Sequence, residues 1–240
     1  QAGERTQASS WLRRLGDHAL STGAVPESIA AFEHALVLLP DNMLNEQAEL
    51  QIRLGNALER TGDYEPAAEY LQQALAYGQK LQADGLIIEA RLGLGRVFMR
   101  QGDYEQSIQY NQAALLQTKN PALRAQAERV LGIIAYYQAE YPQAIERIST
   151  ALDLEQKAGN RAGAATCLSN LGLVSLSQGN YPAALRYFEQ SLAIHRELGD
   201  RAGARHRLRC SAPRHDWEEK AMKAVIGGLV VVVVVCGWAS

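Results

Sequence analysis

A repeat of helix-forming segments runs through most of this chain. Five times, a Leu-Gly pair is followed, nine residues after its glycine, by a large residue that begins a second segment. The glycines are Gly16, Gly55, Gly95, Gly132 and Gly172, and the large residues are Val25, Tyr64, Tyr104, Tyr141 and Tyr181. Successive glycines are 39, 40, 37 and 40 residues apart. This period is typical of proteins built from stacked supersecondary units. Such stacks expose extended concave surfaces that usually bind other proteins.

Each unit is predicted to contain a helix, a tight turn and a second helix. Glycine precedes the second helix by two residues at positions 23, 62, 102 and 179, where it can supply a positive φ, and Ala139 replaces it in the fourth unit. Asp63, Asp103 and Asn180 follow these turns and can cap the next helix. The first helices are predicted over residues 9–22, 45–61, 84–101, 121–138 and 161–178. The second helices are predicted over residues 26–38, 65–80, 105–119, 142–157 and 182–198.

The second helices carry one apolar stripe each. In the last unit, Tyr181, Leu185, Phe188 and Leu192 fall at i, i+4, i+7 and i+11, which is the spacing of one helix face. Small residues recur beside this stripe. The glycine in the middle of each first helix costs roughly 1 kcal/mol of helix propensity, so close helix packing is the expected compensation. Asn111 replaces a large apolar residue in the third unit, which predicts a weaker repeat there.

The order Leu-Gly, Gly-Asp-Tyr, Ala, large residue and Ala resembles the tetratricopeptide repeat over residues 9–200. The segments 154–181 and 187–204 are similar to its variety of about forty residues, which is typical of kinesin light chains, polarity adaptors and many bacterial signalling and regulatory proteins. The resemblance implies an all-α, right-handed superhelical solenoid of antiparallel helix pairs with about five repeats. Residues 1–8 are then expected to be an N-terminal lead-in.

The resemblance also implies that the first helices line a concave groove for a protein or peptide partner. Arginines in such a groove can anchor carboxylates, and apolar positions can bury side chains. Asn170 could bond the backbone of a bound peptide, because its amide offers both a donor and an acceptor, or it could simply bond its own turn. The chaperone-type carboxylate clamp is not expected, because Glu89 and Gly93 stand where that clamp needs basic residues. The expected groove positions are Arg13, Asp17, Leu20, Glu49, Ile52, Arg53, Asn56, Glu59, Glu89, Leu92, Arg96, Met99, Gln126, Arg129, Ile133, Tyr136, Thr166, Ser169, Asn170, Leu173 and Leu176.

Composition narrows the function classes. The formal net charge of −2 argues against a nucleic-acid partner, which normally selects a strong basic footprint. The three cysteines lie far apart and form neither a metal-ligand spacing nor a disulfide framework, which favours a reducing, cytoplasmic setting. The five histidines show no metal spacing, and no nucleophile and base form a readable signature. We therefore expect no catalytic site, no metal and no cofactor. Because the chain begins with Gln1 rather than Met, it is expected to be a fragment or a processed product.

The C-terminal part departs from the repeat. Residues 200–204 copy the start of the fifth first helix, but Ser211 and Ala212 stand where Leu-Gly should recur. Residues 201–223 carry seven Arg or Lys against three Asp or Glu, and residues 224–240 are uncharged and rich in valine. Seventeen helical residues span about 25 Å, which is short for a bilayer. Three interpretations stay open: a membrane anchor with the repeats on the cytoplasmic side, a sequence translated out of frame, and a capping helix or strand.

These observations predict a non-catalytic scaffold that binds a peptide or partner protein in its groove. Two alternatives remain at this point. One is a regulatory or sensor segment of a larger bacterial signalling or transcription-regulator protein, and the other is a membrane-tethered assembly factor.

Overall fold

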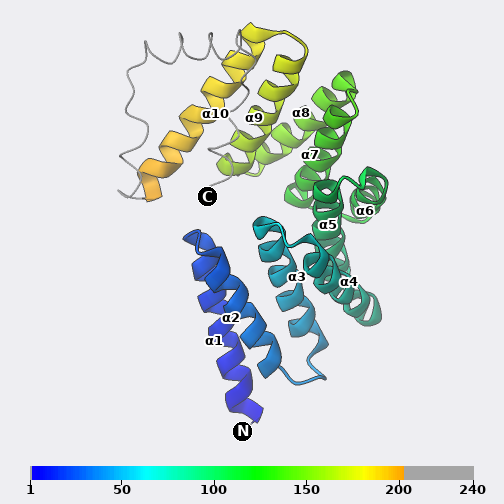
Figure 1. Cartoon of the computed structure of the whole chain (residues 1–240), viewed down its shortest axis with the longest axis vertical. Coiled ribbons are helices and arrows are strands. Elements are labelled where there is room, and N and C mark those ends of the chain that lie inside the picture. The colour runs from blue at the N-terminus through cyan, green and yellow to red at the C-terminus, as the bar shows by residue number, and fades with distance from the viewer. Residues whose placement is uncertain (1, 203–240) are drawn as a thin grey trace. The chain divides into compact units, whose positions relative to one another are not determined.

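The structure is a computed structural model, and it describes residues 2–202. Residues 1–195 belong to one compact unit, and the described residues 196–202 belong to a second. The described residues form ten helices and no strand, so the predicted all-α solenoid is confirmed (Figure 1). The helices are α1 (Ala2–Ser21), α2 (Val25–Leu38), α3 (Leu44–Thr61), α4 (Tyr64–Leu81), α5 (Asp84–Gln101), α6 (Tyr104–Gln117), α7 (Pro121–Tyr137), α8 (Tyr141–Lys157), α9 (Arg161–Ser177) and α10 (Tyr181–Ala202).

The helices stack as pairs in chain order. From α1 to α9, each helix packs on the next, and the first helices α3, α5, α7 and α9 also contact one another in sequence. The last pair is joined by the Ser191 hydroxyl, which donates to the backbone oxygen of Ala165 at 2.8 Å. Nine of the ten predicted helices agree with the structure at their first residue to within one position.

The start of the chain differs from the prediction. Helix α1 begins at Ala2, so residues 2–8, expected as a lead-in, are helical. The extra turns lie against the end of α2. Arg5 donates to the backbone oxygen of Val37 at 3.3 Å, and the Ser9 hydroxyl donates to that of Ala35 at 2.8 Å. These tertiary contacts fix a segment whose sequence carries no apolar stripe.

The turns follow the predicted chemistry in most units. Gly102 and Gly179 adopt positive φ angles of 83° and 73°, and Ala139 adopts 61° in the equivalent place. Asp103 accepts a capping hydrogen bond from the Gln106 amide at 3.0 Å. Asp63 does not cap α4, because its carboxylate instead accepts a 2.6 Å hydrogen bond from the Thr61 hydroxyl. Capping is therefore a property of individual turns rather than of the repeat.

The mid-helix glycines permit close packing, as predicted. A Cβ atom on Gly55 would lie 2.6 Å from the Leu71 side chain, and one on Gly93 would lie equally near it. Leu71 of α4 is thus held between its own first helix and the next one. The equivalent residue in the third unit is Asn111, which is fully buried and whose Oδ1 atom has no hydrogen-bond partner among the described residues.

The apolar core is divided at this third unit. One buried cluster runs from Phe32 to Phe98, and another runs from Ala135 to Val174. Between them lie only two small clusters, around Leu92 and around Val130. Because Asn111 occupies the bridging position, no large apolar side chain joins the two halves there.

The basic segment 201–223 lies almost wholly, and the valine-rich segment 224–240 wholly, outside the described residues. Within residues 2–202, the helices are all too short or too polar to cross a membrane.

Candidate binding surface

Polar side chains link neighbouring first helices across the expected groove. We call the side of the stack formed by α1, α3, α5, α7 and α9 the first-helix surface. Between α1 and α3, Arg13 pairs with Glu49 at 3.1 Å, and Arg53 pairs with Asp17 at 2.6 Å. Both pairs are partly exposed, so each contributes little to stability. Each pair brings together one positive and one negative charge at this end of the surface.

Arg96 is the centre of the network between α3 and α5. Its guanidinium lies 3.6 Å from the Glu59 carboxylate and donates to Asn56 Oδ1 at 2.6 Å. Arg100 pairs with the other oxygen of Glu59 at 3.3 Å. Burial lowers the pKa of the Arg96 guanidinium below its ordinary value, while the charge of Glu59 opposes that shift. Arg96 also donates to the side-chain oxygen of Gln126 at 3.5 Å, which extends the network to α7.

Arg129 stands apart from this network. It is half-buried on α7, and it forms no hydrogen bond or ion pair with any residue between 2 and 202. Its positive charge acts on Arg96 of α5 and on Cys167 of α9, so it lies between those two helices. A cation that is partly removed from water and has no counter-charge is unfavourable, and an anion supplied by a ligand would relieve it.

The surface between α7 and α9 is mostly uncharged. The hydroxyls of Tyr136 and Ser177 lie 3.2 Å apart, and the ring of Tyr136 packs against that of Tyr141 with centroids 6.2 Å apart. Asn170, one helical turn after Cys167, has a buried Nδ2 atom without a hydrogen-bond partner among the described residues. This end therefore offers an arginine and aromatic surface, while the amide donor of Asn170 is buried.

Several expected groove residues point elsewhere, which corrects the sequence interpretation. Ile52, Leu92 and Met99 are only 4%, 2% and 7% exposed. They pack into the apolar clusters between adjacent helices and offer no surface to a partner. The hydroxyl of Ser169 lies 2.8 Å from that of Ser191 and thus faces its own second helix. Thr166, by contrast, is exposed on α9, and its hydroxyl donates to the backbone oxygen of Ala162 in the same helix.

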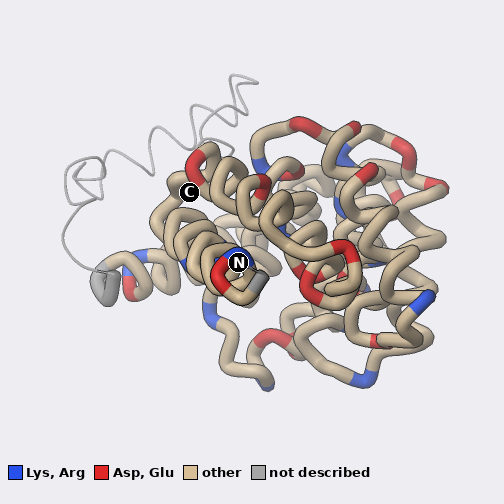
Figure 2. Tube along the Cα trace, turned by 90° about the horizontal axis from the view of Figure 1, so that it is seen from below, with Lys and Arg blue, Asp and Glu red and all other residues tan. Residues whose placement is uncertain are grey.

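The remaining expected positions are accessible to different degrees. Glu89 is exposed, and the half-buried ones are Leu20, Ile133, Leu173 and Leu176. Charges of both signs are distributed over many helices (Figure 2).

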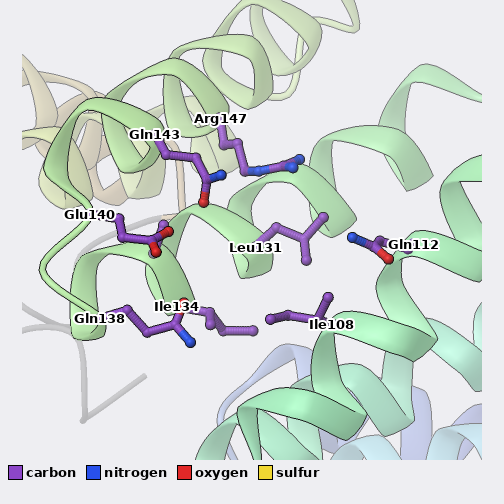
Figure 3. Close-up of a pocket in the computed structure, with 9 residues that line it drawn as sticks. Ile108, Gln112, Leu131, Ile134, Gln138, Glu140, Gln143 and Arg147 are labelled. Carbon is purple, nitrogen blue, oxygen red and sulfur yellow. The ribbon is translucent and has the colours of Figure 1, made fainter.

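A hollow that the sequence did not predict lies on the other side of α7. It measures about 280 Å³ and is lined by residues of α6, α7 and α8 and the turn before α8 (Figure 3). Its walls carry the amides of Gln112, Gln138 and Gln143 and the guanidinium of Arg147. Arg147 is already paired with Glu128 at 2.9 Å. The 37-residue spacing between Gly95 and Gly132, against 39 or 40 residues between the other glycines, is a sign of irregular packing in this region.

Comparisons with known proteins agree with this architecture. Sequence profiles described as tetratricopeptide repeat match residues 52–124 and residues 123–197, which together exceed half of the chain. The chain belongs to the tetratricopeptide repeat family. The resemblance predicted from the sequence is therefore confirmed, and proteins of this family are generally non-catalytic scaffolds for protein–protein interaction. Among curated proteins, no significant sequence match is found.

Solved structures show the same fold at low sequence identity. A Rap protein complexed with competence and sporulation factor superposes with a TM-score of 0.74 and 16% identity, over 80% of this chain and 55% of that one. The Rap conjugation gene regulator of plasmid pLS20, in complex with the Phr* peptide, superposes with a TM-score of 0.72 and 16% identity, over 80% of this chain and 54% of that one. BtubC from P. vanneervenii superposes with a TM-score of 0.59 and 20% identity, over 89% of this chain and 95% of that one. The chain thus spans about half the length of the Rap structures.

Proposed function

We propose that this protein is a non-catalytic scaffold that holds a segment of a partner protein on its first-helix surface, with a carboxylate of the partner bound by Arg129. The observation that carries the proposal is the contrast between Arg129 and its neighbours. Arg13, Arg53 and Arg96 are each satisfied by an acidic side chain of the adjacent first helix. Arg129 alone among these groove arginines has no such partner within residues 2–202.

The chemistry around Arg129 defines the partner segment. An aspartate or glutamate side chain, or a chain-terminal carboxylate, can accept two parallel hydrogen bonds from a guanidinium. The Nδ2 atom of Asn170 is buried without a hydrogen-bond partner among the described residues, so a change of its side-chain rotamer would let it donate to a backbone oxygen of the same segment. Tyr136 of α7 and Leu173 of α9 are half-buried and supply apolar area, which suits a segment with mixed acidic and apolar side chains. Two Rap proteins of the same fold are in complex with competence and sporulation factor and with the Phr* peptide, which supports a protein or peptide partner.

An affinity-capture experiment tests the proposal. The full chain is immobilised and exposed to lysate of its source cells, beside the variants Arg129→Gln and Asn170→Ala. Arg147→Gln is the matched control, because it removes the same charge from the hollow on the other side of α7. We expect a partner that is retained by the parent and by Arg147→Gln and is lost from Arg129→Gln. Equal capture by all forms would contradict the proposal, and loss from Arg147→Gln alone would move the site to the hollow.

A second candidate is a regulatory segment of a longer protein. It is favoured by the coverage of the Rap structures, because this chain matches only about half of their length. The sequence of the complete gene distinguishes the two: a catalytic or DNA-binding domain beside the repeats would favour the regulatory segment, and repeats alone would favour the scaffold.

A further inference from the structure

The hollow beside α7 lies where two aromatic residues of the repeat are missing. In the third unit, Phe98 of α5 stacks on Tyr110 of α6, with ring centroids 5.6 Å apart and the ring planes 1° apart. The residues at the same repeat positions of the fourth unit are Ala135 of α7 and Arg147 of α8. Both of them line the hollow. The hollow therefore occupies space that an aromatic pair fills in the preceding unit.

A second, smaller hollow continues the first one along α7 and α8. It measures about 180 Å³, and Gln143 and Arg147 line both hollows, which we together call the α7 channel. On α7 the lining residues run from Glu128 to Gln138, which corresponds to about 15 Å of helix. An extended chain advances by about 3.3 Å per residue, so the channel has the length of roughly four or five peptide residues.

Unpaired amides stand above an apolar floor in this channel. The side chains of Gln112, Gln138 and Gln143 line it and form no hydrogen bond with the described residues (Figure 3). Each amide offers both a donor and an acceptor, which is what the backbone of an extended segment needs. Leu131 and Ile134 of α7 form the floor, where an apolar side chain of a ligand can lie.

The charges of the α7 channel favour a basic ligand. The lining contains the carboxylates of Glu128, Glu140 and Glu146 but only one cationic side chain, Arg147. Arg147 is already paired with Glu128 at 2.9 Å. Glu140 and Glu146 form no ion pair with any residue that the structure describes. A lysine or arginine of a ligand would complement these two carboxylates, whereas an acidic segment would be repelled.

We propose that the α7 channel binds a second partner segment, in extended conformation, that carries basic and apolar side chains. The glutamine amides bond the backbone of this segment, and a basic side chain pairs with Glu140 or Glu146. Leu131, Ile134 and Gln138 project from the face of α7 opposite to Arg129. The two sites are therefore separate and select segments of opposite charge, and this inference does not depend on Arg129.

A phage-displayed library of random peptides, selected on the full chain, tests the proposal. We expect the selected peptides to combine lysine or arginine with apolar residues. Fluorescence polarisation then gives the affinity of one selected peptide for each variant. The double variant Glu140→Gln and Glu146→Gln should weaken binding about fivefold or more, because it removes both unpaired carboxylates. The matched control, Glu65→Gln with Glu105→Gln, removes two exposed carboxylates outside the channel and should leave the affinity unchanged.

Two further variants separate charge from shape. Arg147→Gln should strengthen binding, because it leaves the Glu128 carboxylate free to attract the basic segment. Ala135→Phe restores the aromatic residue of the third unit and should abolish binding by filling the hollow, while circular dichroism verifies that the helices form. If Ala135→Phe does not fold, the glutamate variants decide.

The same peptides distinguish this site from the first-helix surface. Arg129→Gln should bind them as tightly as the parent does. The proposal is overturned if no peptide binds the parent, or if the parent and the double glutamate variant bind with equal affinity. It is also overturned if the selected peptides are acidic and are lost from Arg129→Gln, a result that would support the first-helix surface alone.

Discussion

Ala139 has a positive φ angle at a turn position where the other four units carry a glycine. Its φ of 61° lies in the left-handed region, which costs a residue with a Cβ atom roughly 1 kcal/mol or more. We predict that Ala139→Gly raises the free energy of unfolding by about 1 kcal/mol, since glycine adopts this angle without strain. Urea denaturation measures the change.

The reverse substitution is the control for that prediction. Gly102 has a φ of 83° and open space around the position of a Cβ atom, so Gly102→Ala adds backbone strain without a steric clash. It should lower the free energy of unfolding by about 1 kcal/mol. If both substitutions change stability in the same direction, the strain assigned to Ala139 is wrong.

Cys167 links stability to pH. Burial raises the pKa of this thiol from 9.0 to about 11, and the charge of Arg129 only partly opposes the shift. The unfolded chain therefore loses this proton first, and the folded state should lose about 2–3 kcal/mol of stability as the pH rises from about 9 to about 11. Because tyrosines and lysines titrate over the same range, the measurement is the difference in pH dependence between the parent and Cys167→Ala. Parallel curves for the two proteins would show that the thiol is not buried.

At the scale of helices, α6 is the weak element. Asn111 packs against Gly95 and donates from Nδ2 to the Ser107 backbone oxygen at 2.8 Å, while its Oδ1 atom is left without a partner among the described residues. We predict that Asn111→Leu stabilises the protein by about 1–2 kcal/mol, because it removes a buried unsatisfied carbonyl and joins the divided core. Thermal unfolding monitored by circular dichroism detects the shift. The matched change Leu71→Asn in the preceding pair should destabilise it, and a loss of stability in Asn111→Leu would mean that Gly95 cannot accept a larger neighbour.

The helices could be predicted closely from the sequence because local signals mark both of their ends. Turn glycines and the large residue after them place the start of every second helix from α2 to α10 within one residue. The start of α1 could not be predicted in the same way, because Arg5 and Ser9 are held by contacts to α2 rather than by a local pattern.

The orientation of the first helices was less predictable than their position. Ile52, Leu92 and Met99 lie at positions that the family places in the groove, but neighbouring first helices approach closely enough to bury them. Sequence spacing predicts which residues share one face of a helix. Whether a residue at the edge of that face is buried depends on how close the next helix pair lies. The hollow beside α7 has the same origin, since it depends on packing among α6, α7 and α8.

For the molecule as a whole, the first-helix surface changes character along the stack. The α1–α3–α5 end is covered by ion pairs between adjacent helices, and the α7–α9 end offers Arg129 and Asn170 without partners among residues 2–202. Ion pairs formed within the protein must be broken before a ligand can use them, so binding is expected at the α7–α9 end.

Titration calorimetry with the captured partner's binding segment tests this account most directly. The dissociation constant is measured for the parent, Arg129→Gln and Arg147→Gln at one salt concentration. We predict that Arg129→Gln weakens binding about tenfold or more, which corresponds to about 1.4 kcal/mol, and that Arg147→Gln leaves it unchanged. Equal dissociation constants for the parent and Arg129→Gln would contradict the account.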